Sequence, residues 1–228
     1  MTTFVLIPGA RCGPWHWRLV AGELRGRGHD VVTVDLPCGD DSAGLAEYAQ
    51  AVIAAVGDRT GVVLVAHSFA GFSAPLVCAH LPVELLVLVT AMVPAPGETP
   101  EGWFASTRCE EIRAEAAARE GRPPDGEAGL YFHDLSPGRA AEAAAHWREQ
   151  SLTPASQPWP LSAWPPVPTR HLLCRADRLF PAEMLRRVSA ERLGFAPDEM
   201  DGGHFPMLSR PKDLADRLER YGRSSSLP

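Results

Sequence analysis

Short runs of apolar residues recur along the chain, and each ends at a polar or turn-forming residue. The runs cover residues 4–7, 31–34, 62–65, 85–89 and 171–174. A further candidate run lies just before Asp201. Continuous apolar runs of this length are typical of strands that are buried on both faces of a sheet. The pattern therefore predicts parallel strands in the middle of the fold.

Stretches with helical spacing separate these runs. In residues 44–56, for example, Leu45, Tyr48 and Val52 recur every three or four positions and form one apolar face. Similar stretches cover residues 15–28, 71–80 and 211–221. Buried strands that alternate with helices predict an α/β fold, with helices on both faces of a mostly parallel, doubly wound sheet.

The alternation stops in residues 94–168, which are rich in proline, alanine, glutamate and arginine. Helices are expected at 110–120 and 137–149, and a proline- and tryptophan-rich stretch follows them. The segment is too long for a plain loop. Its four tryptophans favour packed structure over a disordered linker. We therefore expect a core made of residues 1–93 and 169–228, with residues 94–168 inserted as a small helical cap. The serine-rich end, residues 224–226, is expected to fray.

Composition excludes several classes of protein. The chain has 228 residues, of which 45% are hydrophobic and 22% are charged, so one core can form without a metal or disulfide. The net charge of −6 argues against nucleic-acid binding. Of the 22 basic residues, only Lys212 is a lysine, which we attribute to coding bias.

The cysteines and the first residues of the chain indicate the cellular compartment in which the protein is expected. Five widely spaced cysteines without a C-x-x-C pair favour reduced thiols over a disulfide framework or a structural zinc site. The start of the chain has no basic region and no cleavage site of a signal peptide. No apolar run reaches the roughly 18 residues needed to cross a bilayer. We expect a cytoplasmic protein that needs no metal or other cofactor and contacts no membrane. Monomer and homodimer both stay open.

The strongest local signal for chemistry surrounds Ser68. A buried apolar run leads into Ala66-His67-Ser68-Phe69-Ala70-Gly71, and a helix is expected next. A serine on a sharp strand-to-helix turn needs small residues two positions away on each side, because bulky ones would collide with adjacent chain. Ala66 and Ala70 meet this requirement. The segment predicts a nucleophile, and His67 is interpreted as structural.

A serine hydroxyl needs a base, and the base needs an orienting acid. Asp177 follows the run at 171–174, and His204 follows two glycines after the last candidate strand. The order Ser68, Asp177, His204 matches that of one hydrolase fold. The alternatives for the acid and base are Asp134, Asp201 and His133, of which residues 133 and 134 fall in the cap.

Acyl transfer also needs hydrogen-bond donors for the developing oxyanion. The main-chain N–H of Phe69, directly after the nucleophile, is one candidate. The N–H of Ala10, in the loop after the first strand, is the other, and Gly9 would permit close approach of that loop.

These residues and their surroundings resemble the α/β-hydrolases, and more narrowly the branch of plant methylesterases and hydroxynitrile lyases. Residues 4–17, Phe-Val-Leu-Ile-Pro-Gly-Ala-Arg-Cys-Gly-Pro-Trp-His-Trp, are similar to that branch's opening F-V-L-[IV]-H-G-A-x-H-G-A-W-x-W. Residues 66–71 resemble its G-[HE]-S-x-G-G. Asp177 with Phe180 resembles its D-x-x-F, and residues 202–204 resemble its closing G-G-H.

Three departures refine the resemblance. The histidine that the family places before the oxyanion glycine is Pro8 here, so its hydrogen bonds must be replaced or absent. The lyases have a threonine at the position of Gly9 and a lysine directly after the catalytic histidine, where this chain has Phe205. Without that lysine a cyanide leaving group lacks its cationic partner. The resemblance thus implies ester hydrolysis rather than cyanohydrin cleavage.

The sequence therefore predicts a serine hydrolase that forms an acyl-enzyme from a small hydrophobic ester or thioester, either free or attached to a carrier protein. We expect a pocket between sheet and cap, lined by Gly9, Trp17, Trp103 and Phe205. Two alternatives remain open. The same residues could pass the acyl group to a nucleophile other than water, as in biosynthetic thioesterases and acyltransferases. The protein could also be a small-molecule receptor with vestigial hydrolysis.

Overall fold

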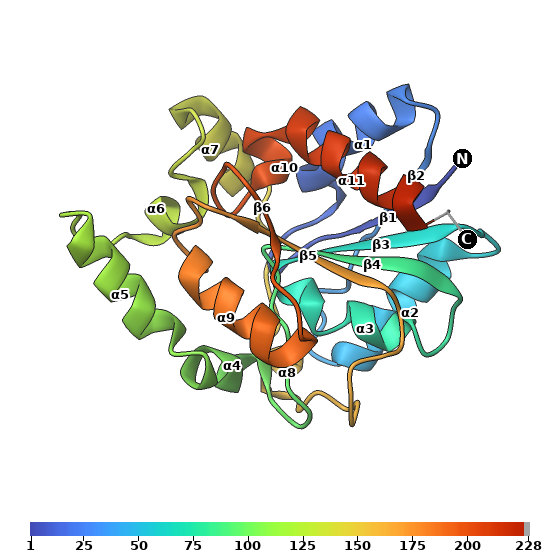
Figure 1. Cartoon of the computed structure of the whole chain (residues 1–228), viewed down its shortest axis with the longest axis horizontal. Helices are drawn as coiled ribbons and strands as arrows, with labels where there is room; N and C mark the ends of the chain where they lie inside the picture. The colour runs from blue at the N-terminus through green and yellow to red at the C-terminus, as the bar shows by residue number, and fades with distance from the viewer. Residues whose placement is uncertain (226–228) are drawn as a thin grey trace.

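A computed structural model describes residues 1–225 of the chain. Its six strands form one sheet in the order β2-β1-β3-β4-β5-β6, and each neighbouring pair is parallel (Figure 1). The predicted fold class is confirmed, and the described sheet is parallel throughout. The strands are β1 (Thr3–Ile7), β2 (Asp30–Thr33), β3 (Val62–His67), β4 (Val83–Val89), β5 (Thr169–Cys174) and β6 (Asp198–Met200).

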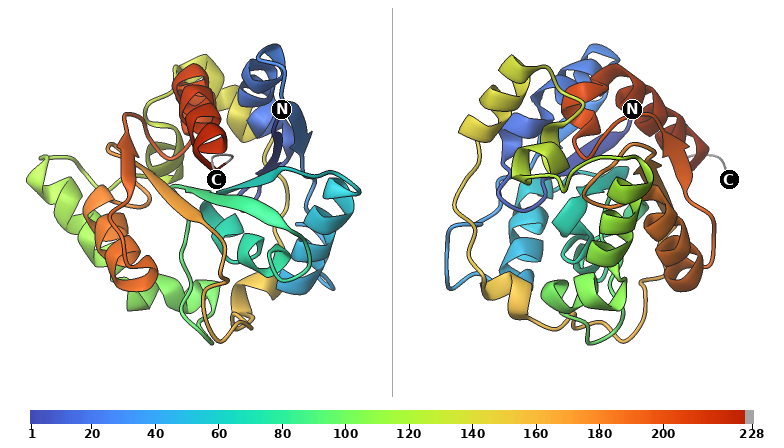
Figure 2. Two further views of the ribbon diagram at one scale, coloured as in Figure 1. Left: turned by 45° about the vertical axis from the view of Figure 1, so that its right-hand side comes forward. Right: turned by 90° about the vertical axis from the view of Figure 1, so that its left-hand side faces the viewer.

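Both faces of the sheet are covered by helices. Successive side chains of a strand point to opposite faces, so Phe4 and Leu6 pack in one apolar cluster while Val5 and Ile7 pack in the other. The first cluster is closed by α1 (Arg18–Gly26), α10 (Pro206–Ser209) and α11 (Pro211–Ser225). The second is closed by α2 (Leu45–Val56), α3 (Ala74–Val77) and α9 (Ala182–Leu193). Figure 2 shows the sheet between these two layers.

The helix expected at residues 71–80 is broken in the structure. A 3-10 turn η2 (Ser68–Gly71) precedes α3, which spans only four residues. Pro75 explains the break, because it has no N–H to donate and its ring would collide with the carbonyl of Gly71 in a continuous helix. A second 3-10 turn, η1 (Pro14–Trp17), likewise opens the predicted helix at 15–28. Helix α9 has no counterpart among the predicted elements.

Residues 94–168 are packed, as their tryptophans predicted. Trp103 and Trp159 are buried, and their indole N–H groups donate to the main-chain carbonyls of Val93 and Phe72. Figure 1 shows this segment, in green and yellow, leading around the sheet toward the carboxyl ends of its strands. Its helices are α4 (Pro100–Ser106), α5 (Cys109–Arg119), α6 (Glu127–Phe132), α7 (Pro137–Ala145) and α8 (Thr153–Ser156).

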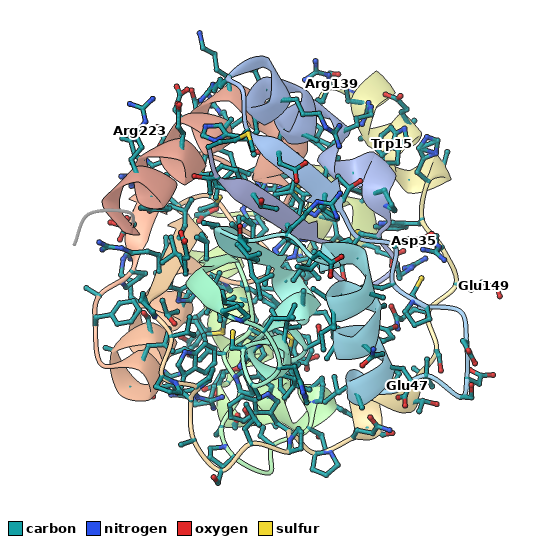
Figure 3. All side chains as sticks on the ribbon, turned by 90° about the vertical axis from the view of Figure 1, so that its right-hand side faces the viewer. Trp15, Asp35, Glu47, Arg139, Glu149 and Arg223 are labelled. Atoms are coloured by element: carbon teal, nitrogen blue, oxygen red, sulfur yellow. The ribbon has the colours of Figure 1, made fainter. Side chains whose placement is uncertain are left out.

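Most charged side chains lie at the periphery of the molecule, and Asp177 is a buried exception. The labelled acidic and arginine side chains in Figure 3 point outward from the ribbon, while the apolar sheet lies inside. All five cysteines are free thiols. Residue 226, the last of the serines expected to fray, lies outside the described residues.

Candidate active site

Ser68 lies on a sharp turn between β3 and η2. Its φ is +54°, a left-handed conformation that side chains other than glycine rarely adopt. The turn is held by the loop that follows β4, because the main-chain N–H of Met92 donates to the Ser68 carbonyl at 3.0 Å. A Cβ at Gly71 would lie 1.8 Å from the carbonyl oxygen of Met92, so only glycine fits there. Strand, turn and neighbouring loop together present the Ser68 hydroxyl at the carboxyl edge of the sheet.

A continuous chain of hydrogen bonds joins Ser68, His204 and Asp177. Nε2 of His204 lies 3.0 Å from Oγ of Ser68, and Nδ1 of His204 lies 2.8 Å from Oδ2 of Asp177. A carboxylate only accepts, so Nδ1–H donates to Asp177 and Nε2 is left to accept from the serine hydroxyl. The three residues are separated by up to 136 positions in sequence, and the tertiary structure brings them together.

Asp177 is held in place by its own loop. Its second oxygen, Oδ1, accepts the main-chain N–H groups of Leu179 and Phe180 at 2.9 and 3.0 Å. The carboxylate is therefore fully hydrogen-bonded although the residue is buried. The ring of Phe180 packs edge-on against the imidazole of His204, with centroids 5.0 Å apart. These contacts restrict the rotation of both the acid and the base.

His67, which we interpreted as structural, helps to hold the base His204 in place. Its Nε2–H donates to the main-chain carbonyl of His204 at 2.8 Å. Burial, with a smaller contribution from the nearby His204, lowers the pKa of His67 well below its usual value. His67 is therefore neutral, and the carbonyl it contacts sets which ring nitrogen carries the proton.

The loop after β1 approaches Ser68 closely. A Cβ on Gly9 would lie 2.9 Å from Cβ of Ser68 and 3.0 Å from Nδ1 of His67, so a larger residue would push the loop away. Ala10 and Phe69, the two predicted oxyanion residues, border the same cavity as Ser68. Phe69 is the second residue of η2, where a main-chain N–H has no partner inside the helix.

Gln150 is a site residue that sequence reasoning missed. Its Oε1 accepts the main-chain N–H of Arg11 at 3.0 Å, and its Nε2 donates to the hydroxyl of Tyr48 at 2.9 Å. The N–H of Arg148 donates to the carbonyl of Arg11 at 2.9 Å. Two hydrogen bonds from the inserted segment thus fix the main chain of Arg11, the residue next to Ala10. No local motif marks residue 150, which is 139 positions away from its partner.

An apolar cavity of about 500 Å³ opens above Ser68. Tyr131, also missed from the sequence, lies on its wall and packs edge-on to His204, with centroids 5.8 Å apart. We name this space the active-site cavity. Most of its wall is apolar. Phe104 and Leu152 come from the inserted segment, Leu179 and Phe180 from the Asp177 loop, and Phe69 and Met92 from the core.

None of the four residues expected to line the pocket is among those that border the active-site cavity. Trp17, Trp103 and Phe205 are at most 2% exposed and are not among the residues that line the active-site cavity. Trp17 packs in the apolar cluster that α1 closes, and Trp103 packs against the ring of Phe180. Large rings of this kind fill the core because each removes much apolar surface from water. Gly9 is not part of the cavity wall either, although a Cβ added to it would lie 2.9 Å from Cβ of Ser68.

The alternative acid and base residues flank the site without touching Ser68. Oδ2 of Asp134 accepts the N–H of Gly203 at 2.6 Å, and Nε2–H of His133 donates to the carbonyl of Ala176 at 2.8 Å. Both side chains thereby pin the loops that carry His204 and Asp177. Asp201 is exposed and pairs with Arg175 at 2.7 Å. The tertiary structure thus gives each of the three a contact outside the hydrogen-bonded chain.

Within residues 1–225, no cluster of three or more His, Cys, Asp or Glu side chains is arranged to hold a metal ion. Over the same residues, none of the helices combines the length and apolar character required to traverse a bilayer.

The sequence of the chain matches the model of the alpha/beta hydrolase family over residues 4–217. Methylesterase 7 of Arabidopsis thaliana is 34% identical over 249 residues, which cover 94% of this chain and 94% of that relative. The chain belongs to the alpha/beta hydrolase family. Its resemblance to the methylesterase branch is confirmed, and it is an enzyme of the esterase type.

Solved structures agree with this assignment at the level of the fold. An extracellular alpha/beta-hydrolase from a Paenibacillus species superposes with a TM-score of 0.80 at 20% identity, covering 98% of this chain and 100% of that chain. Polyneuridine aldehyde esterase superposes with a TM-score of 0.77 at 22% identity, covering 97% of this chain and 99% of that chain. Family membership fixes the architecture, whereas the reaction must be argued from the site.

Proposed function

We propose that this α/β-hydrolase is a serine esterase that cleaves small hydrophobic carboxylic esters through an acyl-enzyme. The observation that carries the proposal is the hydrogen-bonded chain Ser68–His204–Asp177 at the floor of an apolar cavity. Its links of 3.0 and 2.8 Å lie within the range needed for proton transfer and for orienting the base.

In the proposed mechanism Oγ of Ser68 attacks the ester carbonyl carbon as Nε2 of His204 accepts the hydroxyl proton. The tetrahedral intermediate carries its negative charge on the former carbonyl oxygen, which the N–H groups of Ala10 and Phe69 stabilise. The imidazolium returns its proton to the leaving alkoxide, so an alcohol departs and an ester to Ser68 remains. His204 then deprotonates a water molecule, whose attack releases the carboxylic acid and restores the serine. Asp177 stabilises the imidazolium throughout.

The cavity supports an uncharged, mainly apolar substrate. Its volume of about 500 Å³ suits a compact ester, and aromatic and aliphatic side chains make up most of its wall. Glu101 is the acidic residue among the residues that line it, and it disfavours anionic acyl groups. A thioester with a small acyl group fits the same chemistry, because its carbonyl carbon is attacked in the same way.

The decisive experiment compares Ser68→Ala with Ser73→Ala. Ser73 is a matched control, because it is fully buried only five residues further along the chain. Wild type and Ser73→Ala should hydrolyse p-nitrophenyl butyrate and gain the mass of one fluorophosphonate adduct on Ser68. Ser68→Ala should keep its circular dichroism spectrum, take no adduct, and lose at least about 10³-fold in kcat.

Retained turnover in Ser68→Ala would overturn the mechanism. Product analysis in water containing a competing alcohol, amine or thiol measures where the acyl group goes. Release of free acid as the main product is the expected result for an esterase.

A further inference from the structure

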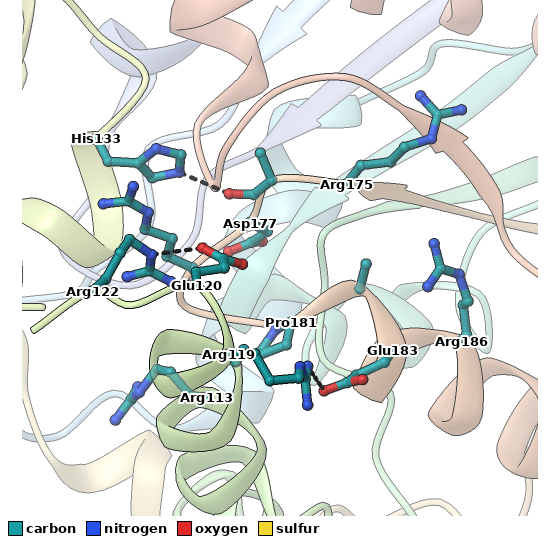
Figure 4. Close-up of a pocket in the computed structure, with 14 residues that line it drawn as sticks. Arg113, Arg119, Glu120, Arg122, His133, Arg175, Asp177, Pro181, Glu183 and Arg186 are labelled. Atoms are coloured by element: carbon teal, nitrogen blue, oxygen red, sulfur yellow. Dashed lines mark hydrogen bonds and ion pairs between the residues drawn. The ribbon is translucent and has the colours of Figure 1, made fainter. Parts of the chain in front are cut away.

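A second cavity, which we name the arginine cavity, lies on the other side of the Asp177 loop. It has a volume of about 400 Å³ (Figure 4). Its walls are α5 and α9, and its floor is the loop that follows β5. Six of the chain's 21 arginines line it, namely Arg113, Arg119, Arg122, Arg175, Arg178 and Arg186. Coding bias accounts for the abundance of arginine in the chain but not for its concentration in one cavity.

The carboxylates around the arginine cavity form a network of ion pairs with five of its six arginines. Asp125 contacts both Arg122 and Arg178, and Glu199 contacts both Arg175 and Arg186. The remaining pairs are Arg119–Glu183, Arg122–Glu120 and Arg175–Asp201. Asp177 faces the same space, but its two oxygens are committed to His204 and to main-chain N–H groups.

Many guanidinium donors are therefore left over. Each arginine carries five N–H bonds, yet Arg119 and Arg178 each donate one bond to a carboxylate. Arg113 has neither an ion pair nor a hydrogen bond to any other side chain in the part of the chain that the structure describes. Guanidinium groups with unused N–H donors border this cavity, and the fork of a guanidinium matches the geometry of phosphate and carboxylate oxygens.

We propose that the arginine cavity binds a small oxyanion that carries two or more negative charges, such as an organic phosphate. The site is separate from the active-site cavity: Asp177, Arg178 and Pro181 line the arginine cavity, whereas Leu179 and Phe180 line the other. The proposal does not depend on the esterase reaction, because the anion contacts neither Ser68 nor the substrate.

The position of the site gives the anion a structural effect. Helix α5 belongs to the inserted segment and buries only Cys109 and Ala117, so few apolar contacts hold it. One ion pair, Arg119 to Glu183 at 2.7 Å, bridges the cavity from α5 to α9. An anion held between the arginines of both helices adds further bridges. Bound anion therefore fastens the inserted segment to the core and stabilises the folded protein.

Arg113→Gln combined with Arg186→Gln tests the site from both walls. Arg113 has no carboxylate partner, and Glu199 keeps Arg175 when Arg186 is replaced, so neither change leaves a carboxylate unpaired. The probe is inorganic pyrophosphate, titrated by calorimetry and by thermal unfolding while sodium chloride holds the ionic strength constant. Arg59→Gln is the control, because Arg59 is ion-paired to Asp30 at the opposite end of the sheet.

Wild type and Arg59→Gln should bind pyrophosphate saturably and gain thermal stability. The double variant should bind at least about tenfold more weakly, because each lost guanidinium removes charge-assisted bonds. Citrate should compete with pyrophosphate, and chloride should not. Equal pyrophosphate binding by the double variant, or a stability gain no larger than that from chloride, would overturn the proposal. The single variant Arg113→Gln decides the matter if the double variant fails to fold. Ester hydrolysis by the folded variants keeps this result distinct from the test of Ser68.

Discussion

The main-chain N–H of Arg11 donates a 3.0 Å hydrogen bond to Oε1 of Gln150. Arg11 has a φ of +62° and directly follows Ala10, so the loop conformation is fixed from the inserted segment. The resemblance to methylesterases implied that Pro8 removes a histidine whose hydrogen bonds hold this loop. In this chain the bonds from Arg148 and to Gln150 hold it instead.

Replacing Gln150 should therefore lower the rate of ester hydrolysis without unfolding the protein. In Gln150→Leu the N–H of Arg11 loses its acceptor, and Ala10 is no longer held against the developing oxyanion. One hydrogen bond of about 1 to 1.5 kcal/mol corresponds to a fall of about tenfold in kcat. Steady-state kinetics with a short ester, which limits effects on substrate fit, measures kcat and KM separately.

Two variants separate this positioning role from general damage. Gln150→Glu keeps an oxygen that accepts the Arg11 N–H, so it should restore most of kcat. Gln157→Leu removes a similar bond between the inserted segment and the core, from the N–H of Leu45 to Oε1 at 2.8 Å, away from the active-site cavity. It should reduce stability while kcat stays near that of wild type. Equal losses of kcat in Gln157→Leu and Gln150→Leu would refute the positioning role.

Gly71→Ala should destabilise the fold and impair the turn at Ser68. The added Cβ would lie 1.8 Å from the carbonyl oxygen of Met92, and neither backbone can yield without moving the other. We expect a loss of about 2 to 3 kcal/mol in the free energy of unfolding. Urea unfolding measures the loss, and ester hydrolysis by the folded fraction should fall as well.

Gly22→Ala is the matched substitution in open space. Gly22 lies inside α1, and nothing lies within 4 Å of its added Cβ. Alanine favours a helix interior by about 1 kcal/mol over glycine, so this variant should be more stable than wild type. Similar changes in the free energy of unfolding for Gly22→Ala and Gly71→Ala would contradict the prediction. They would mean that the Met92 backbone does not restrict the size of the side chain at position 71.

Acid should destabilise the protein through His171. Both ring nitrogens of this residue are buried, and burial lowers its pKa from 6.5 to about 4. Between these two pH values the unfolded chain binds a proton that the folded chain excludes. Stability therefore falls as pH decreases from about 6.5 towards 4, by about 2 kcal/mol at pH 5 from this residue.

His171→Leu should remove this part of the pH dependence. Urea unfolding at pH 7 and pH 5 should show a smaller difference for the variant than for wild type, and higher stability than wild type at pH 5. His16 has its pKa lowered by burial to about 4 as well, so a residual slope is expected. Parallel stability curves for variant and wild type would show that His171 is not a source of the acid sensitivity.

Local sequence determined the strands and the nucleophile. A strand buried on both faces must be apolar at successive positions, so the runs that became β1, β3, β4 and β5 were visible without any partner. Ser68 was visible because small residues on both sides are a local steric demand of its turn. Asp177 and His204 were predicted from their places after strands, since the carboxyl ends of parallel strands meet at one edge of a sheet.

Tertiary structure alone decided the rest of the site. Gln150, Tyr131 and part of the wall of the active-site cavity come from the inserted segment, whose side chains reach the core through contacts more than 50 positions apart. Trp17, Trp103 and Phe205 were predicted to line the pocket but fill the core instead. The sequence does not distinguish an aromatic side chain that faces a substrate from one that is buried in the core. The arrangement of arginines and carboxylates around the Asp177 loop also emerges only when α5 and α9 lie on either side of one cavity. Hydrophobic periodicity indicates which residues are buried, but only the packing of the folded chain decides which other residues they contact.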